Sequence, residues 1–222
     1  MCGRYNLIHD PAVWRLTRPI RVGKTAPFQP RYNIAPGQQV PVFRQSGNEL
    51  ELVDMAWGFV PHFITDEHPK VHPINARAET AFDKPCFRES MDERRCLIPT
   101  TGYYEWQAQD GHKQPFHIHL ARQHPFLMAG IWDYWGGDET QPTVAILTTQ
   151  APMDLTVIHD RMPVIIPNEL IYNWFEQPDN RLLMPVGAGV FEADPISTRI
   201  NNARNEGADV LAISNTKNDD EK

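Results

Sequence analysis

Twenty prolines are distributed along this chain of 222 residues, and they constrain its fold more than any other residue type. Proline lacks a backbone N–H and clashes with the preceding turn, so it interrupts helices and central strands alike. Six tryptophans accompany the prolines. Together they predict an irregular, loop-rich fold rather than a helix bundle. At this length the chain is most simply one domain.

Short apolar segments bounded by turn residues predict strands and hairpins. Residues 40–60 predict two strands around a Ser-Gly-Asn turn, and residues 95–121 predict a hairpin with a glycine-containing turn. Residues 126–135 and 143–150 predict buried strands. Further strands are expected within 161–167 and 190–198. Strands therefore predominate, and they recur as hairpins.

Helical patterns are few and short. Asp10 followed by Pro11 predicts a helix start, and residues 74–95 have helical composition that is interrupted near Pro85. Residues 151–159 and 168–176 predict two further short helices. We therefore expect an α+β fold with a mainly antiparallel, barrel-like β-sheet core, flanked by short helices, in a single domain over residues 1–210.

The net charge of −7 at face value argues against a nucleic-acid ligand, but the charge is unevenly distributed. Before position 36 the chain has six cations and a single carboxylate, that of Asp10. Such a local basic patch can hold phosphates whatever the global charge. Residues 211–222 are polar and acidic, and we expect a disordered tail there.

Three cysteines, Cys2, Cys86 and Cys96, are odd in number and lack CxxC spacing. This pattern argues against a disulfide framework and against a zinc site. No apolar segment approaches the ~20 residues that a membrane span needs, and the start lacks the apolar core of a signal peptide. We therefore expect a cytoplasmic protein that has no membrane partner.

Two polar residues lie where chemistry is plausible. Glu105 is set between Tyr104 and Trp106, where partial desolvation would raise its pKa and suit it to acid–base work. The alternative is that strand alternation directs Glu105 into solvent. His159 precedes an apolar strand, and it fits either a general acid or base or a histidine that satisfies a helix C-terminus.

Other candidates have plausible structural interpretations. Asn75 and Arg77 would share one face of an extended segment, where they could orient a carbonyl and grip a phosphate. A capped helix start with a surface salt bridge is the simpler reading. His117 and His119 have strand spacing that suits a metal, but no third ligand has motif spacing, which favours an ordinary hairpin face. The stretch Trp132–Trp135 is expected to belong to the core rather than to form a base-stacking platform.

Cys2 follows the initiator methionine, so removal of Met1 would leave an α-amine and a thiol on adjacent carbons. The amine has an ordinary pKa of about 7.7–8.0, and the thiol pKa of about 8.5 can be lowered by a cation such as Arg4. The thiol could attack an amide carbonyl, as in N-terminal-nucleophile hydrolases. Alternatively, the amine could condense with an aldehyde to a Schiff base that the thiol closes to a thiazolidine. The opening residues leave both reactions open.

The motifs MCGRY, RYNIAPGQ, MAWGFVP, INARAET, RCLIPTTGYYEW and IHDRMPVII occur in this order along the chain. The ordered set resembles the SOS-response-associated peptidase (SRAP) family, and the resemblance extends from Cys2 to about residue 200. It implies a protein that forms a covalent thiazolidine crosslink with abasic sites in single-stranded DNA. It implies no metal and no other cofactor, a monomer, and association with the nucleoid when DNA is bound.

The resemblance also assigns roles to residues. It implies that Cys2 is the nucleophile, that Asn75 orients its amine or the sugar, that Glu105 is the general acid–base, and that His159 assists proton transfer. The same thiol is implied to remove Met1 autocatalytically. The residues implied to contact DNA are Arg4, Arg77, Arg161, Phe63, Pro36 and Thr148.

One segment departs from the family pattern. After WGFVP the family often has aromatic residues that wedge against DNA, whereas this chain has His62, Phe63 and Ile64. Phe63 can stack or wedge and Ile64 can only wedge, so a preference for duplex junctions stays open. Three other functions also stay open: a glutaminase-type hydrolase, since such chains commonly begin Met-Cys-Gly, a non-covalent single-stranded-DNA-binding module, and a protease that acts on other proteins.

Overall fold

The computed structural model describes residues 2–213, except 67–71, 110 and 177–178. The strands among these residues are β1 (Tyr5–Leu7), β2 (Ile20–Val22), β3 (Arg31–Ile34), β4 (Gln39–Ser46), β5 (Glu49–Trp57), β6 (Asn75–Arg77), β7 (Arg95–Thr100), β8 (Gly102–Gln109), β9 (His112–Leu120), β10 (Phe126–Tyr134), β11 (Pro142–Gln150), β12 (Arg161–Pro163) and β13 (Phe191–Pro195). The α-helices are α1 (Ala78–Ala81), α2 (Pro85–Glu93) and α3 (Ile171–Glu176). Short 3-10 helices cover Pro11–Val13, Ala121–Gln123, Trp135–Gly137, Asn168–Leu170, Asn180–Leu183, Thr198–Asn201 and Ala208–Leu211.

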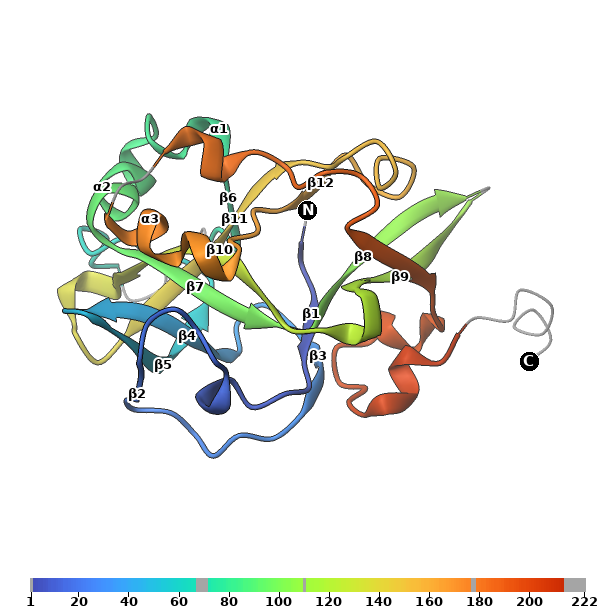
Figure 1. Cartoon of the computed structure of the whole chain (residues 1–222), viewed down its shortest axis with the longest axis horizontal. Coiled ribbons are helices and arrows are strands. Elements are labelled where there is room, and N and C mark those ends of the chain that lie inside the picture. Colours follow the sequence, from blue (N-terminus) through green and yellow to red (C-terminus); the bar gives the residue numbers. More distant parts are fainter. Residues whose placement is uncertain (1, 67–71, 110, 177–178, 214–222) are drawn as a thin grey trace.

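Two sheets form the body of the molecule (Figure 1). The five-stranded sheet has the order β13-β9-β8-β1-β3. The eight-stranded sheet has the order β12-β11-β10-β7-β4-β5-β2, with β6 added beside β11. β7 and β8 are consecutive in the chain and lie in different sheets, so the segment around Thr101 carries the chain from one sheet to the other.

The larger sheet curls, because β5 pairs in parallel with β11 over Ala56–Thr143 and Trp57–Val144 as well as with β4. Most of the other pairs are antiparallel, and the helices are short and peripheral. The expected α+β class with a mainly antiparallel, barrel-like core is therefore confirmed, although the barrel is not closed. The right-handed twist of strands favours such curling in a sheet of this size.

Apolar side chains fill the interior in two clusters. One contains Cys2, Tyr5 and Trp57, and the other contains Phe43, Phe59 and Trp174. Trp132 packs against the first cluster while the guanidinium of Arg44 covers its ring at 5.3 Å. The expected core position of Trp132 is thus confirmed in part, since the ring stays half-buried.

Both expected hairpins are present. Gly47, at a φ of 60°, occupies the turn between β4 and β5, where glycine avoids the steric cost of the left-handed region. β8 and β9 pair over their full length from Gly102–His119 to Gln109–His112. Both hairpins were accessible to sequence reasoning because short-range turn chemistry fixes their register.

The structure corrects two of the expected helices. Asp10 does cap Ala12 at 2.9 Å, but only the 3-10 turn Pro11–Val13 follows, because Trp14 becomes extended and packs on Phe43. Residues 151–159 form successive turns, with the amides of Leu155 and Thr156 both bonded to the carbonyl of Pro152. So short a segment gains little from cooperative helix formation, and packing decides its conformation.

Backbone contacts continue slightly past the expected domain end. Ile213 forms an antiparallel bridge with Ile196, and Val210 is fully buried. The rest of the expected tail, residues 214–222, lies outside the described residues.

Candidate active site

The beginning of the chain runs along strand β8. Tyr5 pairs with Tyr103, and the amide of Tyr104 donates to the carbonyl of Arg4 at 2.9 Å. Partners in an antiparallel pair advance in opposite directions, so continuing this register brings Gly3 opposite Glu105. The topology therefore brings the nucleophile candidate to the acid–base candidate.

Cys2 is fully buried, and its Sγ lies 4.0 Å from the carbonyl oxygen of Arg4. Burial, and after it the negative charge of Glu105, raises the pKa of the Cys2 thiol well above its ordinary range. The expectation that Arg4 lowers this pKa is therefore wrong for the structure described here. The guanidinium of Arg4 is turned elsewhere, and desolvation dominates. The thiol is protonated until a base removes its proton.

Glu105 is 3% exposed, so its strand position does not direct it into solvent. Burial raises the pKa of Glu105. A positive charge on nearby His159 would act in the opposite direction and lower it. The expected desolvation of Glu105 is thus confirmed, whereas Tyr104 and Trp106 pack in a separate cluster with Ile196 and Ile200. Such a carboxyl group can hold a proton nearer to neutral pH than an exposed glutamate can, as general acid–base catalysis requires.

Asn75 connects the second sheet to the first residue of the site. Its Nδ2 donates to the carbonyl oxygen of Cys2 at 2.9 Å, while its Oδ1 is buried and has no hydrogen-bond partner among the described residues. Arg77, two residues along β6, is exposed. The expected common face of Asn75 and Arg77 fits the observed extended segment, which ends where α1 begins.

His159 follows the turns of residues 152–159, and its side chain is 30% exposed. Its Nδ1 lies 2.9 Å from the amide nitrogen of Arg161 and 2.9 Å from Oδ1 of Asp160. Neutral Nδ1 can accept from the amide, whereas protonated Nδ1 can donate to the carboxylate. Either protonation state therefore has a partner, which suits a group that exchanges protons.

Arg161 makes a forked ion pair with Glu79. Its Nη1 and Nη2 lie 2.6 Å and 2.9 Å from the two carboxylate oxygens, and Nη2 also donates to the carbonyl of Thr148 at 2.6 Å. Thr148 is fully buried, so any contact of this residue with DNA would be transmitted through Arg161. Side-chain exposure is 11% for Arg161 and 45% for Glu79.

Arg4 is half-buried and engaged within the protein. Its Nη1 donates to Oδ1 of Asn33 at 2.6 Å and to the carbonyl of Ile200 at 2.8 Å. Asn33 in turn donates to the carbonyls of Asn202 and Asn205. Arg4 thus ties the first strand to the C-terminal segment. The other two residues implied to contact DNA, Pro36 and Phe63, are exposed on loops.

Sequence reasoning missed two of these partners. Asn33 gave no local signal, because its contacts come from residues about 170 positions away in the chain. Glu79 did have a signal, since it lies in the INARAET motif two residues after Arg77. The simpler interpretation of that motif, a capped helix start with a salt bridge, is therefore realised in part: Glu79 pairs with Arg161, but the N-cap residue Arg77 makes no side-chain cap hydrogen bond.

His117 and His119 stack on each other with ring centroids 4.6 Å apart. Asn6 lies 3.1 Å from Nε2 of His117, and Asp194 lies 3.0 Å from Nε2 of His119. Burial lowers the pKa of His117 to about 3, so this ring is neutral. Within the described ranges, no cluster of three or more His, Cys, Asp or Glu side chains has the geometry to hold a metal ion.

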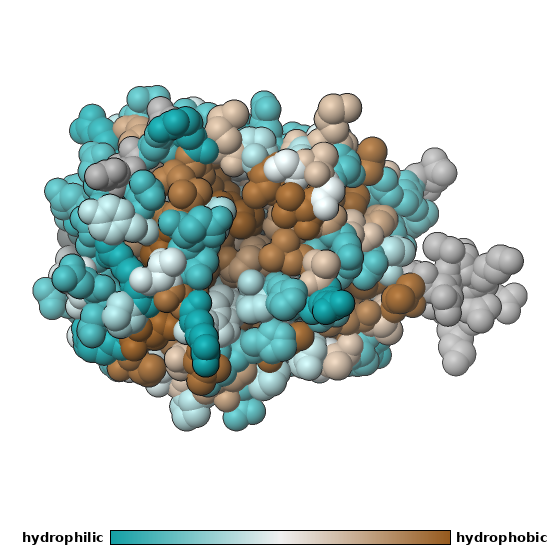
Figure 2. Space-filling view, viewed as in Figure 1, coloured by the Kyte–Doolittle hydropathy of each residue, from teal (hydrophilic) through white to brown (hydrophobic). Residues whose placement is uncertain are grey.

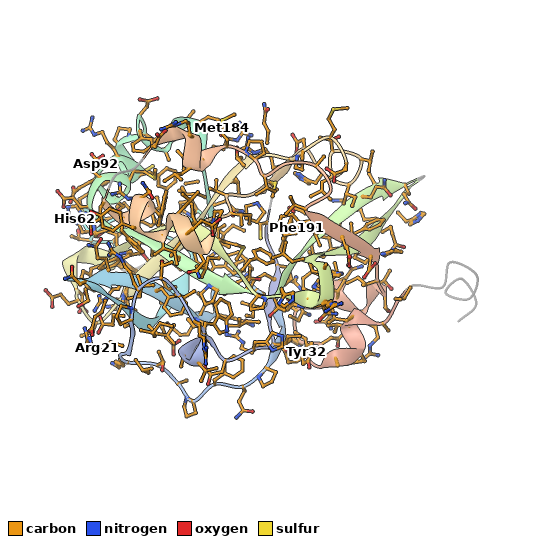
Figure 3. The ribbon with its side chains drawn as sticks, viewed as in Figure 1. Arg21, Tyr32, His62, Asp92, Met184 and Phe191 are labelled. Carbon is orange, nitrogen blue, oxygen red and sulfur yellow. The ribbon has the colours of Figure 1, made fainter. Side chains whose placement is uncertain are left out.

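The surface of the molecule has two hollows of interest. A cavity of about 610 Å³ adjoins the Arg161–Glu79 pair, and its lining includes Glu79, Phe82, Gln150 and Met184. Met184 is labelled at the top of the molecule in Figure 3. Figure 2 shows a second, apolar hollow in the middle of the face, where Phe191 lies in Figure 3. This groove of about 490 Å³ has no thiol or histidine in its lining, which makes it a poor catalytic candidate.

No helix in the part of the chain that the structure describes is long and apolar enough to cross a membrane. In the comparison with protein families, SOS response associated peptidase (SRAP) matches residues 1–203. The chain is 35% identical over 197 residues to the abasic site processing protein YoaM of Bacillus subtilis, covering 85% of this chain and 87% of that protein. It is 30% identical over 224 residues to the abasic site processing protein YedK of Escherichia coli, covering 95% and 99%.

The fold has a counterpart among solved structures. A protein from Bacteroides thetaiotaomicron superposes with a TM-score of 0.74 at 27% sequence identity. The superposition covers 82% of this chain and 85% of that chain. The likeness therefore spans the sheets that carry the candidate site.

Proposed function

The chain belongs to the SOS response associated peptidase (SRAP) family, and we propose that it processes abasic sites in single-stranded DNA by a covalent crosslink through Cys2. Two relatives that are named abasic site processing proteins support the substrate. The observation that carries the chemistry is the hydrogen bond of 2.9 Å from Asn75 to the Cys2 carbonyl. It holds the nucleophile residue in a buried site that also contains Glu105.

The crosslink forms two bonds at C1′ of the ring-opened deoxyribose. After Met1 is removed, the α-amine of Cys2 attacks the C1′ aldehyde and gives a carbinolamine. Protonated Glu105 donates its proton to the departing hydroxyl, so water leaves and an iminium ion remains. The thiol sulfur then adds to C1′, and its proton returns to Glu105. The net reaction joins Cys2 to the sugar as a thiazolidine and releases one water.

The environment of each group favours this sequence. Burial that raises the pKa of Glu105 keeps a proton available for the departing hydroxyl. The raised pKa of the thiol means that this proton needs an acceptor, and the carboxylate that Glu105 has just become is suited to accept it. An open Schiff base acidifies the C2′ protons and promotes strand cleavage, and ring closure suppresses that route.

Met1 removal is the second activity that we propose for Cys2. Its sulfur attacks the carbonyl carbon of Met1, the amide bond breaks, and the acyl group passes to sulfur while the amine of Cys2 is freed. Water then hydrolyses the thioester and releases methionine. This activity would account for a peptidase reaction confined to the protein's own first bond.

Binding of the single strand needs cations for the backbone and flat surfaces for bases. Arg77 is exposed and forms no salt bridge among the described residues, so we propose it as a phosphate contact that has no such bridge to break. Arg161 can reach a phosphate only in competition with Glu79. Because these contacts join cations to phosphates, binding should weaken steeply as salt rises, and the net charge of −7 adds no long-range attraction to offset the loss.

The direct test mixes the Met1-processed protein with single-stranded DNA that carries one abasic site. A denaturation-resistant adduct should form, and none should form with the intact oligonucleotide. Intact-mass measurement first verifies that Met1 is absent. Cys2→Ala should give no thiazolidine, although borohydride should still trap an imine through the remaining amine.

Failure of the processed wild-type protein to form any adduct would overturn the proposal. Two controls identify what replaces it. Ammonia release from glutamine would indicate an amidohydrolase, and tight binding of abasic DNA without an adduct would indicate a non-covalent binding module.

A further inference from the structure

The loop after β5 is anchored by a buried carboxylate in β10. Asp133 is 3% exposed, and its Oδ2 accepts from the backbone nitrogen of His62 at 2.9 Å. The same oxygen lies 3.0 Å from Nδ1 of His62, so one carboxylate holds both the backbone and the ring of this residue. On its other side, Oδ1 accepts from the amide of Tyr134 at 2.8 Å and lies 3.2 Å from Nε of Arg94.

A second anchor lies two residues earlier in the same loop. The hydroxyl of Thr143 accepts from the amide of Val60 at 2.9 Å, and it lies 3.2 Å from the carbonyls of Val60 and Asp133. The amide of Ile64 closes the turn by donating to the carbonyl of Pro61 at 3.0 Å. The backbone before the exposed tip is therefore held at Val60 and at His62, and the bond from Ile64 to Pro61 closes the turn.

The tip itself presents an aromatic ring to solvent. Phe63 is 53% exposed, and its ring stands edge-on to that of His62 with centroids 5.5 Å apart. Among the exposed large hydrophobic side chains of the described residues, the other aromatic is Tyr172, which Arg18 already covers at 5.3 Å. Phe63 is thus an exposed aromatic ring, and the backbone beside it is held by Asp133.

The charges around this tip favour a base over a phosphate. Asp133, Glu89 and Glu93 surround Arg94, and Glu89 also lies 3.7 Å from Nε2 of His62. Among the described residues of this cluster, three carboxylates stand against one arginine and one histidine, which gives no excess positive charge. A phosphate would be repelled here, whereas the uncharged face of a nucleobase can stack on an aromatic ring whatever its sequence.

The tip also lies away from the nucleophile. His62 is labelled at the outer edge of the molecule beside α2 in Figure 3, whereas β1, the strand that follows Cys2 in the chain, lies near the middle of the same view in Figure 1. A base that stacks here therefore belongs to DNA flanking the abasic nucleotide and not to its immediate surroundings.

From these contacts we propose that Asp133 is a positioning residue that holds the His62–Phe63 tip in place to stack on a flanking base of the bound strand. The inference rests on the proposed function, because it assumes single-stranded DNA as the ligand. Phe63 makes the contact, and Asp133 acts through it.

The test measures non-covalent affinity in a Cys2→Ala background, so that the crosslink does not obscure binding. Two abasic oligonucleotides are compared: a short one that ends close to the abasic site, and a longer one that extends on both sides. Phe63→Ala should lower the preference for the longer DNA by about 5- to 100-fold, the loss of one base stack. Asp133→Asn should cause a similar loss, and the double variant should lose no more than Phe63→Ala alone.

Two further variants separate positioning from general damage. Phe63→Tyr keeps the ring and should keep the preference. Glu51→Gln alters another buried carboxylate, which holds Arg44 and Arg21 away from this loop, and it should leave the preference intact. Thr143→Val removes the second anchor, and it replaces Asp133→Asn if that variant does not fold.

The outcomes are distinct. Additive losses in the double variant, or an unchanged preference in both Asp133→Asn and Thr143→Val, would overturn the role of Asp133. Absence of any adduct between the wild-type protein and the short oligonucleotide would instead refute the proposed function. An adduct on the short DNA together with an unchanged preference in Phe63→Ala would refute the stacking contact alone.

Discussion

Glu105 and Asp133 are equally buried carboxylates, each 3% exposed, but their surroundings differ. Asp133 is surrounded by polar partners: the backbone and the ring of His62, the amide of Tyr134 and the guanidinium of Arg94. Desolvation dominates the surroundings of Glu105 and raises its pKa, and the charge of His159 opposes that shift. Burial alone therefore does not distinguish the proposed catalytic carboxylate from a structural one. The neighbouring donors and charges do.

The difference between Glu105 and Asp133 predicts different effects when each carboxylate is replaced by its amide. Glu105→Gln removes the proton carrier, so crosslinking should slow by about 100-fold or more, which is a usual contribution of general acid–base catalysis. Thermal stability should not fall, because an amide fits the same space and carries no charge that burial disfavours. Single-turnover crosslinking with saturating abasic DNA measures the effect. An unchanged rate would remove Glu105 from the mechanism.

Asp133→Asn should instead mainly lower the free energy of unfolding. The substitution weakens charge-assisted hydrogen bonds that hold a loop, and we expect a loss of about 2–3 kcal/mol in the free energy of unfolding. Urea denaturation of this variant beside Glu105→Gln gives the comparison directly. A larger loss of stability in Glu105→Gln than in Asp133→Asn would contradict the distinction between the two carboxylates.

The pH dependence of stability sharpens the same contrast. Because the folded-state pKa of Glu105 is raised, the folded protein retains this proton at pH values where the unfolded chain has released it. The unfolded state is then favoured as pH rises from the ordinary glutamate pKa through the raised one. Wild-type stability should therefore fall relative to Glu105→Gln across that window and level off above it. A constant difference over the window would show that burial does not shift this group.

Glu79 is a partly exposed carboxylate, and its substitution should have the smallest effect on DNA binding of the changes considered. Glu79→Gln removes the competitor that holds the Arg161 fork, so abasic single-stranded DNA should bind several-fold more tightly at low salt. A partly exposed ion pair is worth only about 1 kcal/mol, which limits the gain. Titrations at two salt concentrations should show the gain shrinking as salt rises. Weaker binding would mean that Glu79 orients Arg161 for phosphate instead of competing with phosphate.

Much of the fold could be predicted from the sequence, because its hairpins are local. The turn at Gly47 and the β8–β9 pair depend on residues only a few positions apart. The expected helix over residues 151–159 was wrong, because burial of Leu155 and Ile158 decided the conformation of that segment.

The sequence allowed candidate site residues to be named, but it did not allow their interaction partners to be identified. The fork of Arg161 with Glu79 joins residues 82 positions apart, and that of His62 with Asp133 joins residues 71 positions apart. No short-range pattern encodes such pairs. The structure was also needed to show that Arg4 ties down the C-terminal segment, which its sequence neighbours gave no reason to expect.

The complete burial of Cys2 has a consequence for the order of events during synthesis. The segment that contains Cys2 is made before Asn75 and strand β8, yet both must be present before Cys2 can be enclosed. At a usual rate of about 5–20 residues per second, Glu105 follows roughly 5–20 s later. During that interval a cellular aminopeptidase can reach the first peptide bond of the nascent chain. Under the proposed self-processing, the thiol of Cys2 would cut this bond after the strand has docked, so the speed of translation would help to decide which route frees the amine.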